Sequence, residues 1–288
     1  MILYVQTPSI PRSKLHNKCI KTMMEELDNC SHFSEIRWFV NIDVIKDTKY
    51  KWEDYSETEL NFKNIAKSLS KVKLNLNTSH EPCFYLAFRH LTLNVLKDAE
   101  ENKFQDDQYC TMWLEDDWNF IDIEMFKNLL TKFLQEEQYL VYTLHGLNGA
   151  SSSYPGKLNM GGNPDIIKCS VHKLFKDIDL DKSNKKDPEN IRKFLIWYPY
   201  ILEMSQKSPV EALWDGHGYA YNHLTRLLTQ VNGNINHPIR KLQKKILASN
   251  TVEGIQGDNW RTNIAVHKNW DSWDKLGMNS NKSFTYKS

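Results

Sequence analysis

The sequence predicts an α/β fold with a mostly parallel central sheet flanked by helices. Over roughly the first 145 residues, segments rich in β-branched, aromatic and aliphatic residues alternate with segments whose apolar residues recur at helical spacing. No internal repeat or low-complexity tract interrupts this order. Alternation of this kind favours a parallel sheet with helices on both faces.

The first half of the chain provides most of the predicted elements. Strands are predicted over residues 2–6, 36–42, 72–76, 109–114 and 140–144. Helices are expected from Pro11, from Pro82 and over 121–134, because apolar residues recur on one helical face in each. The segment 46–66 is polar, and residues 46–59 are expected to form a long mobile loop, either a solvated insertion or a flap over a site.

The second half of the chain is less regular. A short helix is predicted over residues 166–175, with Asn163 as its N-cap and Pro164 at its first position. Asp187 and the proline after it predict the start of another helix, and a further helix is expected over residues 209–228.

The overall charge excludes a strong bulk attraction to nucleic acid or membrane. The chain has 37 Lys and Arg against 36 Asp and Glu, whereas a DNA-binding protein more often has a clear basic excess. The five cysteines show no metal-binding spacing and are interpreted as reduced thiols. No segment is long and apolar enough for a membrane span, and the N-terminus has no basic leader, so we expect a cytoplasmic protein.

Three carboxylates follow the predicted strand 109–114 directly, in the motif Leu114-Glu-Asp-Asp-Trp118. Open α/β sheets bind ligands at the carboxyl ends of their strands. Hard carboxylate oxygens there suit Mg²⁺ or Mn²⁺, especially when a diphosphate supplies further oxygens. Considered without the rest of the chain, the three acids would equally fit a solvated turn.

The motif, its position and the order of strands and helices before it resemble the GT-A fold glycosyltransferases, in which an Asp-x-Asp element or a Glu-Asp-Asp version ends a central strand. The resemblance covers roughly residues 1–175. It implies a metal-dependent enzyme that moves a sugar from a UDP- or GDP-sugar donor to the hydroxyl of a saccharide acceptor, with Mn²⁺ or Mg²⁺. It also implies one GT-A-like domain over residues 1–288, with nucleotide and metal bound by 1–118 and an irregular, helical acceptor-binding half in 119–288.

By this resemblance, Asp117 would bind the metal directly, with Glu115 as a further ligand. Glu115 and Asp116 would also reach the ribose or a metal-bound water. A divalent ion held there would neutralise the diphosphate as the glycosidic bond breaks. His267 lies in a segment that resembles a closing element of the family and is the candidate third metal ligand, with His145 and His217 as alternatives.

Four other positions are expected to line the nucleotide pocket. Thr7 and Pro8 follow the first strand, and Asp43 ends the second, where the family grips the nucleobase or ribose. Arg89 lies on the helix before the motif and would contact the phosphates through its planar guanidinium. Asp43 also fits a simple turn acid, and Arg89 a surface ion pair.

The catalytic base is assigned to Glu189, near a helix start, where a carboxylate deprotonates the acceptor hydroxyl in inverting members of the family. Asp215 and Glu211 are alternatives, and Glu189 also fits an N-terminal helix charge. Three other functions remain open: a transferase that acts on modified DNA bases, a metal-dependent phosphohydrolase, and a non-catalytic carbohydrate-binding protein on the same fold.

Overall fold

The computed structural model describes residues 1–44, 55–80, 82, 84–144, 164–177, 246–249 and 251–254. The strands are β1 (Ile2–Ser9), β2 (Glu35–Asp43), β3 (Val72–Ser79), β4 (Tyr109–Trp113), β5 (Trp118–Phe120), β6 (Val141–Thr143), β7 (Asp165–Lys168), β8 (Ile246–Ala248) and β9 (Val252–Gly254). The helices are α1 (Ser13–Lys18), α2 (Ile20–Asp28), α3 (Tyr55–Lys67), α4 (Phe84–Glu101), α5 (Ile123–Gln135), α6 (Cys169–His172) and the 3-10 helix η1 (Lys173–Asp177).

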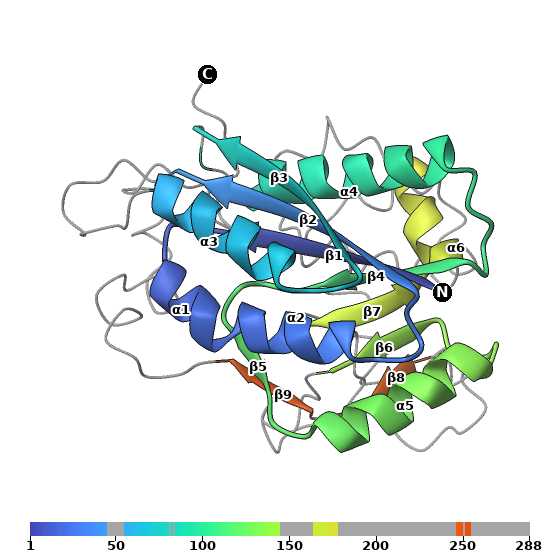
Figure 1. Ribbon diagram of the computed structural model, residues 1–288. Helices are drawn as coiled ribbons and strands as arrows, with labels where there is room; N and C mark the ends of the chain where they lie inside the picture. The colour runs from blue at the N-terminus through green and yellow to red at the C-terminus, as the bar shows by residue number, and fades with distance from the viewer. Residues whose placement is uncertain are drawn as a thin grey trace, which may run out of the picture.

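One large sheet organises the fold, in the order β3-β2-β1-β4-β7-β6-β8 (Figure 1). Among these strands only β7 runs against its neighbours, β4 and β6; the other pairs are parallel. β5 and β9 form a separate antiparallel pair. The predicted fold class, an α/β fold with a mostly parallel central sheet flanked by helices, is confirmed.

Helices cover both faces of the sheet (Figure 1). α1, α2 and α3 lie on one face, where Trp38 of β2 packs edge-on against Phe62 of α3 with ring centroids 5.2 Å apart. α4 lies on the other, where Phe88 packs against Trp113 of β4 at 5.5 Å. Because side chains alternate between faces along a strand, burial on both faces makes the central strands almost wholly buried, as in β4.

The predicted loop over residues 46–59 is wrong at its C-terminal end, because α3 begins at Tyr55. The helix buries Phe62, Ile65 and Ala66 at helical spacing. The helical spacing of these apolar residues is hard to recognise in the sequence because charged residues surround them. Those charged residues form the exposed face of an amphipathic helix. Residues 45–54 lie outside the described residues.

The predicted helix over 166–175 is also wrong at its start. Residues 165–168 form β7, whose carboxyl-terminal end continues into α6. Ile166 and Ile167 are both buried, since β7 is inserted between β4 and β6 and has both faces covered. A buried apolar pair does not show helical or strand periodicity by itself, so the neighbouring strands decide its structure. Pro164 precedes the strand and accepts a hydrogen bond from the Leu144 N–H at 3.0 Å.

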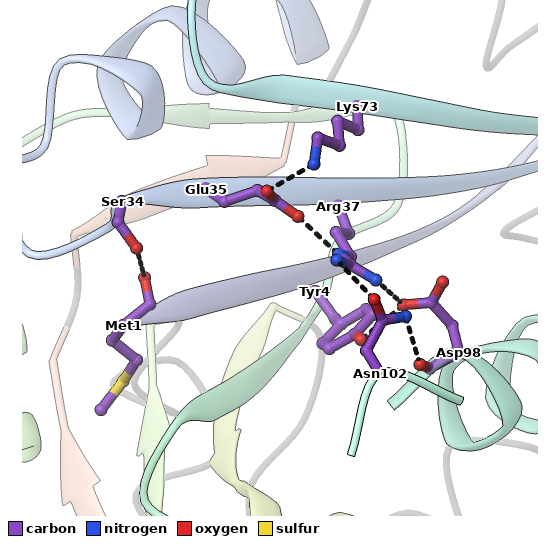
Figure 2. Close-up of polar contacts among 8 residues, drawn as sticks. All are labelled: Met1, Tyr4, Ser34, Glu35, Arg37, Lys73, Asp98 and Asn102. Atoms are coloured by element: carbon purple, nitrogen blue, oxygen red, sulfur yellow. Dashed lines mark hydrogen bonds and ion pairs between the residues drawn. The ribbon is translucent and has the colours of Figure 1, made fainter. Parts of the chain in front are cut away.

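A network of hydrogen bonds and ion pairs links the amino-terminal ends of β1 and β2 to α4. Figure 2 shows Arg37 of β2 bonded to Glu35, Asp98 and Asn102. The Tyr4 hydroxyl donates to Asp98 at 2.5 Å. Burial, and then the hydrogen bond to Asp98, raise the pKa of Tyr4, so this hydroxyl stays protonated. The network ties α4 to β1 and β2.

Replacing Arg37 with alanine is expected to lower the free energy of unfolding by about 1–3 kcal/mol, because hydrogen bonds to charged groups are lost in a site where the side chain is only 14% exposed. Urea denaturation measures this change. Lys73→Ala is the matched control: Lys73 also bonds Glu35, but it is 67% exposed and should contribute at most about 1 kcal/mol. Equal effects of the two substitutions would contradict the prediction.

No helix in the described ranges has the length and apolar character needed to cross a membrane.

Candidate functional site

The carboxyl ends of β1, β2 and β4 lie side by side, and Thr7, Pro8, Asp43 and the three acids of the motif lie at or next to these ends. β1 and β4 pair so that Gln6 lies opposite Trp113, and the Leu114 N–H donates to the Gln6 carbonyl at 3.0 Å. β1 then continues beside β2 as far as Ser9. The Glu-Asp-Asp loop therefore leaves β4 directly beside the last residues of β1, at the edge where α/β sheets bind ligands.

Thr7 and Pro8 lie within β1, because this strand extends beyond the predicted range of 2–6. Both side chains are buried. The Thr7 hydroxyl accepts a hydrogen bond at 3.0 Å from the indole N–H of Trp38, so it points toward the α2–α3 face of the sheet. The structure places the two residues at the expected edge, as part of the sheet; their contact with a nucleotide stays a prediction.

Asp43 ends β2 and is 4% exposed. Its Oδ1 atom accepts a hydrogen bond from the side chain of Asn41 at 2.9 Å, and Asn41 in turn accepts one from the Asn77 side chain of β3 at 2.5 Å. This row of amides across two paired strands restricts the rotation of the Asp43 carboxylate. Asp43 is therefore held in one orientation at the carboxyl edge of the sheet.

The three acids of the motif differ in burial. Asp116 is fully buried, Asp117 is 3% exposed, and Glu115 is partly exposed. Asp116 uses both of its oxygens in contacts with the last residue of β1 and the segment after it. Its Oδ2 atom accepts from the Ser9 hydroxyl at 2.5 Å and lies 2.7 Å from His16 Nε2, and its Oδ1 atom accepts from Arg12.

Asp116, Ser9, Arg12 and His16 form a cluster, the Asp116 cluster, in which the charge of Arg12 favours the ionised form of the Asp116 carboxyl. Burial raises the pKa of the Asp116 carboxyl, but Arg12 and the hydrogen bond from His16 outweigh it, so that the net pKa lies well below its usual range. Arg12 is also close enough to Glu115 and Asp117 for their charges to act on it. The charge of Arg12 thus offsets part of the repulsion among three consecutive carboxylates.

Glu115 and Asp117 were predicted as metal ligands, and this role stays a prediction. Both offer hard oxygen ligands, which fit Mg²⁺ or Mn²⁺. The described ranges contain no group of three or more His, Cys, Asp or Glu side chains placed to hold a metal. Two carboxylates suit a site whose remaining ligands come from a diphosphate and water, as Mg²⁺ sites in phosphate-binding enzymes do.

Arg89 lies on α4, one residue after Phe88, which packs on Trp113 of β4. It is partly exposed on the opposite face of the sheet from Trp38. Its contact with phosphate stays a prediction. Glu189, Asp215 and His267 lie outside the described residues.

Sequence reasoning did not identify Ser9, Arg12 and His16. The spacing of Arg12 and His16 was an available signal, because residues four apart share one helical face, and the His16 N–H does bond to the Arg12 carbonyl at 3.3 Å. Their shared partner, Asp116, is about 100 residues away in the sequence. Nothing local connects the three residues to that carboxylate.

A second buried polar contact lies near this edge on the α4 face. Gln6 Nε2 of β1 is 3.3 Å from His172 Nε2 of α6, and both residues are fully buried. Asp165, also fully buried, is opposite Trp113 in the sheet. Sequence reasoning did not identify these three residues, because their proximity depends on the packing of β1, β7 and α6, which are far apart in the sequence.

Comparisons with known proteins give structural neighbours but no family. No family model matches the chain, and no curated protein matches it. The galactosyltransferase LgtC, in complex with donor and acceptor sugar analogues, is 11% identical, with 96% of this chain and 95% of that chain covered and a TM-score of 0.37. A glycosyltransferase involved in glycosylation of the major capsid of PBCV-1 is 12% identical, with 91% and 98% covered and a TM-score of 0.33.

A third neighbour, 4-diphosphocytidyl-2C-methyl-D-erythritol synthase, is 9% identical, with 63% of this chain and 81% of that chain covered and a TM-score of 0.37. With TM-scores and identities this low, the likenesses carry no argument about what this chain does. The proposal below rests on the residues at the carboxyl edge of the sheet.

Proposed function

We propose that this protein is a metal-dependent glycosyltransferase that moves a sugar from a nucleotide-diphosphate donor to the hydroxyl of a saccharide acceptor. One observation carries the proposal: three consecutive carboxylates leave the central strand β4 at its carboxyl end, beside the end of β1. That is the position where an α/β sheet binds a phosphorylated ligand. Clustered carboxylates alone would repel such a ligand, so a divalent ion is required between them.

The residues of this edge have distinct proposed roles. Asp117 and Glu115 hold Mn²⁺ or Mg²⁺, which neutralises the charge of the diphosphate leaving group. Asp43, oriented by Asn41, accepts a hydrogen bond from the nucleobase or ribose, and Thr7 and Pro8 form the wall of β1 beside it. UDP- and GDP-sugars are the donors proposed.

The acceptor half and the catalytic base form the remaining part of the proposal. Residues 119–288 would shape the acceptor cleft, Arg89 would contact the donor phosphates, and His267 would complete the metal site. Glu189, or else Asp215, would take the proton of the acceptor hydroxyl as the new glycosidic bond forms.

Isothermal titration of UDP and GDP, each with and without Mn²⁺, tests this function. We expect at least one nucleotide to bind more tightly with Mn²⁺, and Asp117→Ala to weaken that binding at least tenfold, which is about 1.4 kcal/mol. Asp28→Asn is a matched control, because Asp28 is also a buried carboxylate (9% exposed) but bonds Ser70 and Lys71.

Absence of Mn²⁺-dependent binding in the unmodified protein would overturn the proposed function. So would binding that Asp117→Ala leaves intact, since the motif would then not hold the ion. Transfer of radiolabelled sugar to glycans, and not to hydroxymethylated DNA, would separate a saccharide acceptor from a modified DNA base.

A further inference from the structure

Asp116 contacts three residues at and just after the end of β1. The Ser9 hydroxyl comes from the last residue of that strand, the Arg12 guanidinium from the turn after it, and His16 from α1. Ser9 and His16 are fully or almost fully buried, and the Arg12 side chain is 16% exposed. One carboxylate thus joins two segments that are about 100 residues apart in the sequence.

We propose that Asp116 is a positioning residue, which anchors the loop after β4 to the β1–α1 segment so that Glu115 and Asp117 face the donor. The proposal rests on the proposed function for the identity of that donor. In this proposal Ser9, Arg12 and His16 hold the Asp116 carboxylate in place. This role differs from the contact with ribose or a metal-bound water that the resemblance implies for Asp116.

Burial and charge favour anchoring over direct contact with a ligand. To reach a ribose or a metal-bound water, the Asp116 carboxylate would have to leave Arg12, His16 and Ser9. Arg12 would then lose its ion pair with Asp116, and breaking a buried pair from one side is strongly unfavourable. Glu115, by contrast, is partly exposed, whereas Asp116 is fully buried.

Anchoring also explains how three consecutive acids coexist on one short loop. Arg12 lies within reach of the charges of all three. The loop is tied on its other side by the Leu114 N–H, which donates to the Gln6 carbonyl of β1. The loop after β4 is thus held by a backbone hydrogen bond at Leu114 and by the side-chain contacts of Asp116. These restraints reduce the number of conformations open to the loop. Groups that orient metal ligands in this way typically change metal affinity when they are removed.

Two substitutions of His16 test the proposal without touching any of the acids. His16→Gln keeps an N–H donor near the Nε2 position, whereas His16→Leu removes it at similar volume. The measurement is the Mn²⁺ concentration that gives half-maximal UDP or GDP binding, at a temperature where circular dichroism shows every variant folded. We expect His16→Leu to require about 10- to 100-fold more Mn²⁺ and His16→Gln to stay close to the unmodified protein.

Asp28→Asn is the control for a purely structural effect, since it removes a buried carboxylate that lies away from the site. It is expected to lower the melting temperature without changing the Mn²⁺ requirement. A normal Mn²⁺ requirement in folded His16→Leu would overturn the proposal, and so would an equal rise in Asp28→Asn.

Failure of the proposed function would be visible separately, as absence of Mn²⁺-dependent nucleotide binding in the unmodified protein. In that event hydrogen exchange of the peptide over residues 109–120 still decides the anchoring. Faster exchange in His16→Leu than in both His16→Gln and the unmodified protein supports it, and equal exchange in the three proteins overturns it.

Discussion

Replacing Arg12 with methionine is expected to lower the free energy of unfolding by about 3–5 kcal/mol. Methionine keeps much of the apolar stem but removes the cation that pairs with Asp116. The Asp116 side chain is fully buried, so its charge would be left in a region of low dielectric with only the bonds from Ser9 and His16. Breaking a buried pair from one side costs this amount because the remaining charge is uncompensated.

Urea denaturation measures the effect, and two further variants interpret it. Arg12→Met combined with Asp116→Leu removes both charges and should recover part of the loss, since the two substitutions act on one pair. Lys127→Met removes a cation from the pair with Glu26, where both side chains are 34% exposed, and should cost at most about 1 kcal/mol. If Arg12→Met were no more destabilised than Lys127→Met, the buried cluster would not stabilise the fold as described.

Replacing Trp38 with alanine should also destabilise the protein by about 3–5 kcal/mol. The indole is fully buried and packs edge-on against Phe62 of α3, and truncating a buried aromatic leaves a cavity that the surroundings fill only partly. Its N–H also donates to the Thr7 hydroxyl, so the substitution removes a partner from a buried group in β1. The loss therefore combines packing with an unsatisfied hydroxyl.

Trp38→Phe separates the two contributions, because it keeps an aromatic ring and removes the hydrogen bond. We expect it to cost less than Trp38→Ala in thermal or urea unfolding. Leu60→Ala is the control on the neighbouring helix α3: Leu60 is 57% exposed and should change stability by no more than about 0.5 kcal/mol. Comparable losses for Trp38→Ala and Leu60→Ala would show that the α3 face does not pack on β2 as the structure has it.

Trp38 and the Asp116 cluster lie on the same face of the sheet, because Phe62 of α3 packs against both Trp38 and His16. Trp38 fixes the Thr7 end of β1 from the helical layer, and Arg12 fixes the loop after β4 through Asp116. Both act on the segment that ends β1. The stability of the fold and the geometry of the candidate site therefore depend on the same residues.

Local sequence patterns were sufficient for the framework of the site. β2, β4 and α4 were predicted close to their observed ranges, because their apolar residues are dense or recur at helical spacing. The position of the three acids followed from their place in the sequence, since residues next to the end of a strand must lie near that end. Asp43 was located at the same edge by the same argument.

Elements whose structure depends on distant neighbours were not predictable in this way. Residues 165–168 form β7 because β4 and β6 provide hydrogen-bonding partners on both sides. α3 begins at Tyr55 because Phe62 and its neighbours find a buried surface against the sheet. In both cases the deciding free energy comes from tertiary burial, which exceeds the weak local preference of a short segment.

The sequence by itself determined that acids follow a buried strand and that this strand belongs to a mostly parallel sheet. Only the tertiary structure decided which of the acids binds the residues at the end of β1 and the start of α1. Glu115, Asp116 and Asp117 have the same carboxylate group, so no local pattern distinguishes them. Asp116 is set apart by Ser9, Arg12 and His16, which the parallel pairing of β1 with β4 brings beside it. Pairing of distant strands is a property of the whole fold, and the burial it creates assigns Asp116 to the interior.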